Sequence, residues 1–301
     1  MTRKLGVYSF LLRSGRPRAS GGAERSWFDG AVLHTGGNHT PPQNMSRFGN
    51  LEFDGEQHGE THAGAPARDE AHFLAGARTA FESAEFEKSL RWFAKVLEFN
   101  PQNVAAWTGQ VRALIELGEF REAALWADKA LERFPREPEL LAAKAVAHGR
   151  SGNLEEAIAL SDASIEERGD TPYVWLARGD VLLAREEARA DYCFEKALLL
   201  APADWTVPWL AARIRHYYKQ ITAAIKLLQL ALERNTTHFL LWLELGNCQL
   251  ALGLAGPAER SFREARQLNP DCSAARLALA RVADTGLWSR CRGWFRQILR
   301  R

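Results

Sequence analysis

A repeat of 34 residues is the feature that most constrains how this chain can fold. Small residues recur at this interval in three independent series between Ala77 and Ala280. Each series contains one step of 33 residues, and the three short steps overlap only between Gly179 and Ala190. A period of this length is typical of stacked structural units that each contact chiefly their neighbours. The series are Ala77, Val111, Ala145, Gly179, Ala212, Gly246 and Ala280; Ser89, Ala123, Ala157, Ala190, Ala224 and Ala258; and Val96, Ala130, Ser164, Ala197, Ala231 and Ala265.

Each repeat predicts two helices joined by a short turn. The first helix carries a large residue four positions before the small one, and glycines then supply the backbone freedom that a helix C-terminus needs. Prolines close several repeats because proline cannot continue a helix. The small residues are explained by packing, since two helices approach to about 8 Å only where the side chains at the crossing are short. The large residues are Phe73, Trp107, Leu141, Trp175 and Trp242, the turn glycines Gly118, Gly152 and Gly253, and the prolines Pro101, Pro135, Pro202 and Pro270.

This pattern resembles the tetratricopeptide repeat family. Two stretches follow that family's consensus nearly position for position, one from Trp107 to Pro135 and one from Trp242 to Pro270. The resemblance covers roughly residues 70 to 285 and implies an all-α, right-handed superhelical solenoid of about six helix pairs plus the first helix of a seventh. The fifth repeat departs from the pattern, because Pro208 stands where the large residue is expected and Trp209 follows it.

The chain outside the repeats has a different composition. Residues 1–66 are rich in Gly, Ser, Arg, Asn, His and Pro, and we expect them to be largely disordered because they cannot bury enough apolar surface. Met1 and Met45 are the two methionines, so translation from Met45 is an alternative start. One aromatic and aliphatic cluster, Phe48-Gly-Asn-Leu-Glu-Phe53, is suited to dock on a partner or back onto the repeats; the alternative is a disordered stretch with a few apolar residues.

After the solenoid, expected over residues 67–285, residues 286–301 predict one last helix. Trp288, Cys291 and Phe295 mark an apolar stripe, and Arg292, Arg296 and Arg300 mark a basic stripe. The favoured interpretation is a capping helix that shields the last repeat, since positive charge suits a helix C-terminus. The alternative is an amphipathic helix that contacts an anionic membrane or nucleic acid.

Composition and motifs exclude several classes of function. A net charge of +2 does not favour a nucleic-acid binder. The four cysteines form no C-x-x-C pair, which suits a reducing compartment, and no apolar stretch approaches the ~20 residues needed to span a bilayer. A targeting segment at the basic and apolar N-terminus stays an alternative to the predicted cytoplasmic location. No catalytic, phosphate-binding or metal-binding motif is present, so we expect no enzyme activity, no cofactor and no metal.

The resemblance also implies where a partner would bind. In this family the first helices line a concave groove through their second, fifth, ninth, twelfth and thirteenth residues. Arginine occupies four of the seven ninth positions here, and guanidinium groups suit carboxylates. Aromatic and arginine side chains are also the usual anchors at interfaces. The alternative is that these side chains pack against neighbouring helices or are solvated. The predicted groove residues are Arg78, Arg112, Tyr173, Trp209, Arg213, His216, Tyr217, Asn247 and Arg281.

The predicted function is therefore a non-enzymatic scaffold that binds a protein or peptide with acidic groups. The family's clamp for chaperone C-termini needs lysine at a fifth and asparagine at a ninth position, and Asn247 is paired with Leu243 instead. Two alternatives stay open. One is an accessory subunit of a separate enzyme, such as a glycosyltransferase; the other is a membrane-peripheral assembly factor that uses the basic C-terminal helix.

Overall fold

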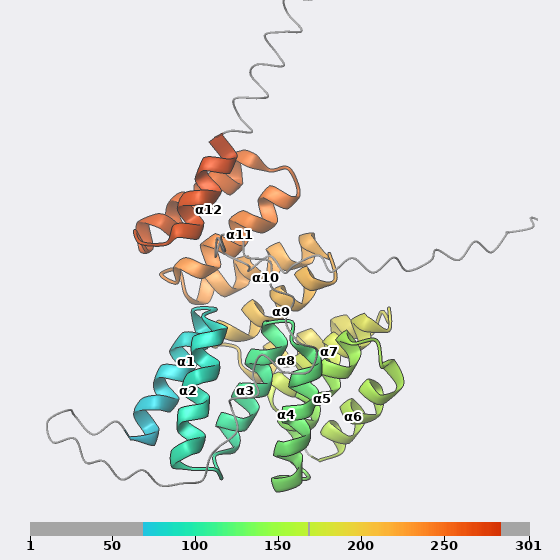
Figure 1. Cartoon of the computed structure of the whole chain (residues 1–301). Helices are drawn as coiled ribbons and strands as arrows, with labels where there is room; N and C mark the ends of the chain where they lie inside the picture. Colours follow the sequence, from blue (N-terminus) through green and yellow to red (C-terminus); the bar gives the residue numbers. More distant parts are fainter. Residues whose placement is uncertain (1–68, 168, 284–301) are drawn as a thin grey trace, which may run out of the picture. The chain divides into compact units, whose positions relative to one another are not determined.

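The computed structural model describes residues 69–167 and 169–283, and within these ranges it contains helices and no strands (Figure 1). The predictions for residues 1–66 and 286–301 concern positions outside the described ranges. Twelve helices are followed by a further helical stretch over residues 273–283. The helices are α1 Glu70–Glu82, α2 Phe86–Phe99, α3 Val104–Glu116, α4 Phe120–Arg133, α5 Pro138–Arg150, α6 Leu154–Glu166, α7 Pro172–Ala184, α8 Ala190–Leu200, α9 Thr206–Tyr217, α10 Ile221–Arg234, α11 Phe239–Ala251 and α12 Ala255–Leu268.

The odd-numbered helices are the predicted first helices of the repeats, and the even-numbered helices are the second. Six pairs and the first helix of a seventh therefore confirm the predicted all-α architecture. Every turn within a pair contains one residue with a positive φ angle, which reverses the chain after the first helix. Glycine occupies only half of these positions, and other residues take the same left-handed conformation in the rest. They are Ala84, Gly118, Gly152, Glu186, Lys219 and Gly253.

The position of the missing residue can now be narrowed. The positive-φ residues keep the 34-residue spacing as far as Glu186, and the next step, to Lys219, is 33 residues. The missing residue therefore falls between Glu186 and Ala190, at the start of α8. As a consequence α8 has 11 residues, whereas the other second helices have 13 or 14.

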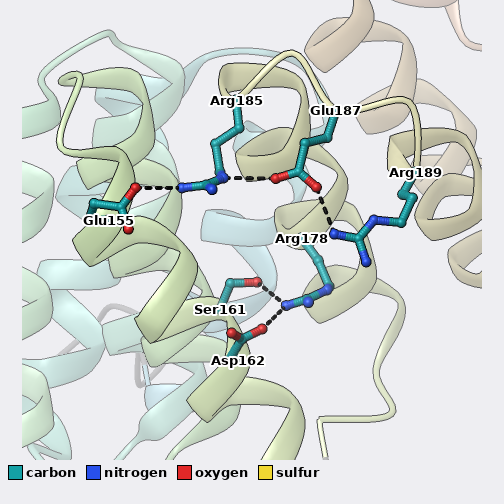
Figure 2. A network of polar contacts seen from close by, with 7 residues as sticks. All are labelled: Glu155, Ser161, Asp162, Arg178, Arg185, Glu187 and Arg189. Atoms are coloured by element: carbon teal, nitrogen blue, oxygen red, sulfur yellow. Dashed lines mark hydrogen bonds and ion pairs between the residues drawn. The ribbon is translucent and has the colours of Figure 1, made fainter.

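Ion pairs gather at this irregular turn (Figure 2). Arg185 contacts Glu187 within the turn at 2.8 Å and Glu155 at the start of α6 at 3.0 Å. Arg189 contacts the same Glu187 at 2.8 Å. Nearby, Arg178 on α7 donates hydrogen bonds to Ser161 and to an adjacent aspartate on α6. Exposed pairs of this kind contribute at most about 1 kcal/mol each, so their main effect is to hold the shortened turn against α6.

The small residues lie where the packing argument places them. Ala123, Ala157, Ala224 and Ala258 are completely buried, as predicted. Two glycines show how little room remains at the crossings between paired helices. A Cβ atom on Gly246 would lie 2.5 Å from the Phe262 ring, and one on Gly179 would lie 2.8 Å from the Phe194 ring. Each second helix thus presses a large side chain against the backbone of the first helix, which excludes even a methyl group.

The tryptophans of the first helices are anchored by a repeated hydrogen bond. The indole N–H of Trp107 donates to the carbonyl of Pro101, and that of Trp242 donates to the carbonyl of Thr236, both at 2.9 Å and both six residues earlier. Each bond fastens the entry of a repeat to its first helix. Trp209 of the fifth repeat lies one position later in its repeat and cannot make this contact.

Candidate partner-binding pocket

The inner faces of the first helices meet through buried charged side chains. Arg213 on α9 donates hydrogen bonds to Glu116 on α3, with its Nε 2.7 Å from the Glu116 Oε2. The same guanidinium contacts Glu244 on α11 at 2.8 Å. Only 6% of the Arg213 side chain is exposed, and the two carboxylates are 12% and 6% exposed. The second, fifth and sixth repeats are therefore joined by one buried arginine.

A second buried pair lies beside the first. Arg150 at the end of α5 contacts Asp180 on α7 at 2.6 Å, and both side chains are almost fully buried. The Tyr218 hydroxyl donates a 2.7 Å hydrogen bond to the same carboxylate. The Arg150 guanidinium also lies 4.4 Å from the centre of the Tyr217 ring. We name the inner charge cluster as Arg112, Glu116, Arg150, Asp180, Arg213 and Glu244, which balances three arginines against three carboxylates.

The two carboxylates that share Arg213 are in different electrostatic states. Burial opposes ionisation of Glu116, but Arg213, Arg150 and Arg112 together hold its pKa below the ordinary value. At Glu244 burial prevails over the single arginine and the Trp209 hydrogen bond, and it raises the pKa to about 7. Glu116 is therefore the permanent counterion of Arg213, whereas Glu244 changes its charge near neutral pH.

Trp209 closes this interior from the side of α9. Its indole N–H donates to Glu244 on α11 at 2.9 Å, and its ring centre lies 6.3 Å from that of Phe81 on α1. The residue is completely buried. A displacement of one position along a helix rotates a side chain by about 100°. The proline at the preceding position therefore moves the repeat's tryptophan from the entry of the repeat to its inner face.

A cavity of about 270 Å³ remains between α1, α3 and α9, and we call it the inner pocket. Phe81 and Trp209 provide aromatic surface, and Thr108 provides a buried hydroxyl-bearing side chain. Charged side chains of both signs complete the lining. They are Arg78 and Glu82 on α1, Arg112 on α3 and Glu139 on α5.

The two arginines of the inner pocket differ from Arg213 in their contacts. The Arg112 guanidinium lies 4.0 Å from the centre of the Tyr173 ring and 5.2 Å from that of Phe81. Within the described ranges, neither Arg112 nor Arg78 forms an ion pair with a carboxylate. Arg78 is exposed, and Arg112 is half-buried between its two aromatic neighbours. Both guanidinium groups can therefore donate to an incoming acceptor.

Among the acidic residues of the pocket, Glu82 has a raised pKa, chiefly because of burial and also because Asp204 is nearby; Arg78 opposes the shift. A second carboxylate, that of Glu139, lies on the opposite helix. The rim thus alternates in charge, and a ligand must present an acidic group to the arginines and keep it away from these two glutamates.

The structure gathers some predicted groove residues and separates others. Arg78, Arg112 and Trp209 line the inner pocket, and Tyr173 flanks it through Arg112. Arg213 is buried in its two ion pairs. His216 is half-buried, with a pKa lowered to about 4 first by burial and then by Lys219 and Arg213. Three predicted residues lie outside the pocket lining: Tyr217, Asn247 and Arg281.

Several residues of this interior were not among the predicted groove residues. Glu116 and Arg150 occupy the thirteenth positions of their helices, and Glu139 occupies a second position, so the rule that selected the others also points to them. Glu244 occupies a sixth position, and no pattern in the sequence marks it. It becomes important only because Trp209 and Arg213 both reach it.

The described part of the chain contains no group of three or more His, Cys, Asp or Glu side chains arranged to hold a metal ion. Cys193, Cys248 and Cys272 are free thiols. None of the described helices combines the length and apolar character that crossing a membrane requires.

Comparisons with known proteins agree with this architecture. The family model described as tetratricopeptide repeat matches residues 80–147. No curated protein matches the chain. Similar solved structures include a chain of the APC/C hetero-tetramer Cut9–Hcn1, with 20% identity and a TM-score of 0.45 over 71% of this chain and 43% of that one. A tetratricopeptide repeat protein from Parabacteroides merdae has 16% identity and a TM-score of 0.45, covering 73% of this chain and 86% of its own.

A third similar structure is a thermophilic tetratricopeptide repeat protein from Thermus thermophilus, with 20% identity and a TM-score of 0.47 over 60% of this chain and 99% of its own. This chain thus spans less than half of the Cut9–Hcn1 chain and nearly all of the Thermus protein. The helix pairs of the matched segment continue with the same spacing to α12. The chain is therefore a member of the tetratricopeptide repeat family.

Proposed function

We propose that this protein is a non-enzymatic scaffold that captures a segment of a partner protein in the inner pocket. The observation that carries the proposal is the state of Arg78 and Arg112, which line a pocket and have no carboxylate partner in the described ranges. The other inner arginines already hold carboxylates of the chain itself. An acidic group of a partner would complete the same pairing.

The pocket suits a peptide anchor because of its size and its walls. A volume of about 270 Å³ accommodates one large side chain, which aromatic walls would desolvate. A single buried anchor of this kind dominates the affinity of many interfaces, and Arg and Trp are frequent on the receiving side. The partner segment should therefore carry one large apolar residue directly beside an acidic one.

Three of the predicted groove residues act directly in this proposal, namely Arg78, Arg112 and Trp209. Tyr173 holds the Arg112 guanidinium in place, and Arg213 shapes the pocket from beneath. The location proposed for the protein is the cytoplasm, since its free thiols suit a reducing compartment.

The experiment is a binding measurement with a peptide library on the purified full chain. Library members carry one Leu, Phe or Trp flanked by Asp or Glu, and matched members carry Asn or Gln instead. Fluorescence anisotropy should show a preference of about tenfold or more for the acidic members, which is the effect of a charge-assisted hydrogen bond of about 1.5–3 kcal/mol.

Variants locate the binding site. Arg78→Ala and Arg112→Ala should each reduce the affinity of the best peptide, whereas Arg121→Ala should leave it unchanged. Arg121 is a suitable control because it is also exposed, lies on α4 outside the pocket and forms no ion pair in the described ranges. Circular dichroism verifies that each variant is folded. Equal affinity for all three variants would refute the pocket as the binding site.

A further inference from the structure

We propose that the chain itself supplies a ligand for the inner pocket: the segment Phe48-Gly-Asn-Leu-Glu-Phe-Asp54, which precedes α1. This inference rests on the proposed function, since it assigns to the same pocket an occupant that competes with the partner. The partner would then bind a receptor whose site is partly occupied in advance.

The chemistry of the segment matches that of the pocket. Leu51 and Phe53 alternate with Glu52 and Asp54, so that each large apolar side chain has an acidic neighbour. The pocket offers the complementary groups in the same small volume. These are the aromatic surfaces of Phe81 and Trp209 and the guanidinium groups of Arg78 and Arg112.

The distance along the chain permits this contact. Arg78 follows the start of α1 by eight residues, which corresponds to about 12 Å along a helix. Fifteen peptide steps separate Asp54 from Asp69, the N-cap residue of α1, and an extended chain of that length reaches about 50 Å. The tether is therefore long enough to fold back, and short enough for an effective concentration on the order of millimolar.

Another stretch before the repeats, Trp27-Phe-Asp29, also combines aromatic residues with an acid. It follows Arg25 directly, which would place a like charge near the two arginines of the pocket. It also lies 40 residues before Asp69, and effective concentration falls as a tether lengthens. The segment from Phe48 to Asp54 is therefore the better ligand, and Phe28 provides a matched control.

Intramolecular occupancy has a direct functional consequence. A partner must displace the segment before it binds, so its apparent affinity is reduced by the fraction of molecules in which the pocket is already filled. Substitutions that weaken the segment should therefore strengthen partner binding, although they lie outside the receptor surface.

The test uses photo-crosslinking in the full chain. The photoreactive amino acid p-benzoylphenylalanine replaces Phe53, and tandem mass spectrometry maps the crosslinked peptides after irradiation. Crosslinks should fall within α1, α3 or α9 and should join residues of the same molecule, which mixing ¹⁵N-labelled with unlabelled protein will show. The substitution Arg78→Glu should reduce their yield several-fold, and adding Glu52→Arg and Asp54→Arg should restore part of it. The control Arg121→Glu should have no effect.

Arg78 is chosen for the charge reversal because it is exposed, so the variant is expected to fold. Crosslinks outside these three helices, crosslinks between molecules, or a yield that Arg78→Glu does not change would each overturn the inference. A second measurement, with the best library peptide, separates it from the proposed function. Leu51→Ala/Phe53→Ala should raise the peptide's affinity by about tenfold, whereas Phe28→Ala should not.

The outcomes are distinguishable. If peptides bind the pocket but Leu51→Ala/Phe53→Ala has no effect on their affinity, the inference fails and the proposed function stands. If the crosslinks localise to the pocket but no peptide binds even in that variant, the proposed function fails and the internal contact stands.

Discussion

Arg213 on α9 and Glu116 on α3 are in direct contact, although 97 residues separate them in the sequence. In a simple solenoid each repeat contacts chiefly its neighbours. Here the fifth repeat also contacts the second through this ion pair, and it contacts the first where Trp209 meets Phe81. The inner faces of the first five repeats are consequently filled largely by the chain's own side chains, and the inner pocket is what remains open.

The first prediction concerns this bridge. Arg213→Ala leaves Glu116 and Glu244 buried without their shared cation, so it should lower the free energy of unfolding by about 3–5 kcal/mol. Urea denaturation followed by circular dichroism measures the change. The control is Arg263→Ala, which breaks an exposed pair with Glu259 and should cost less than about 1 kcal/mol. Equal losses in the two variants would show that the buried bridge does not stabilise the fold.

The second prediction concerns pH. The pKa of Glu244 is about 7 in the folded protein and 4.5 in the reference state, so the folded state binds this proton more tightly. The stabilising contribution is complete below pH 4.5 and is lost as the pH rises through 7. Glu244→Gln has no such proton, so its stability relative to the wild type should rise by about 2 kcal/mol between pH 5 and pH 8.

The comparison with wild type is necessary because His216 acts in the opposite direction. Its pKa is lowered to about 4, so its contribution is present above pH 6.5 and is lost as the pH falls. Both proteins contain this histidine, and its contribution cancels in the difference. Urea midpoints at half-unit pH intervals measure the difference, and a constant gap between the two proteins would contradict the assignment.

A third prediction tests the close approach of paired helices. Gly246→Ala places a Cβ atom 2.5 Å from the Phe262 ring, and the resulting overpacking should destabilise the protein by about 1–3 kcal/mol. Helix propensity alone would predict a gain of about 1 kcal/mol for the same change. Gly256→Ala is the matched control, because nothing lies within 4 Å of its Cβ position. The two substitutions should thus shift the urea midpoint in opposite directions.

A fourth prediction concerns Gln110 on α3. The residue is completely buried, and neither polar atom of its side chain has a hydrogen-bond partner in the described part of the chain. Met has nearly the same shape without the polar groups, so Gln110→Met should stabilise the protein by about 1–2 kcal/mol. The exposed Gln102 gives the control, where the same change should fall within about 0.5 kcal/mol of zero. Thermal or urea unfolding that shows a loss at Gln110 would mean that its amide contributes to the packing.

The repeat spacing predicted the helix pairs because it reflects contacts within a repeat and between neighbours. Ala123 and Gly246 are small for reasons that lie less than 20 residues away in the sequence. The role of Arg213 could not be predicted in this way. Its ninth position indicated an inward side chain, but its partners Glu116 and Glu244 depend on how several successive repeats are oriented. Small rotations at each step decide whether an inner arginine meets a partner's carboxylate or one of the chain's own.

The effect of Pro208 shows the same limit at a single residue. Its presence indicated irregular packing in the fifth repeat, and the structure shows how the irregularity is used. Trp209 gives up the backbone hydrogen bond made by Trp107 and Trp242 and binds Glu244 instead. A tryptophan in the inner face was predictable from its fifth position, whereas its buried carboxylate acceptor was not.

The contact between Arg213 and Glu116 also restricts how this gene can change in length. Repeat arrays commonly gain or lose whole units, because a duplicated unit finds the same neighbours as the original. A unit inserted between α3 and α9 would instead displace the arginine from its carboxylate and leave both charges buried apart. The second to fifth repeats are therefore inherited as one block, and copy number can vary freely only beyond α12.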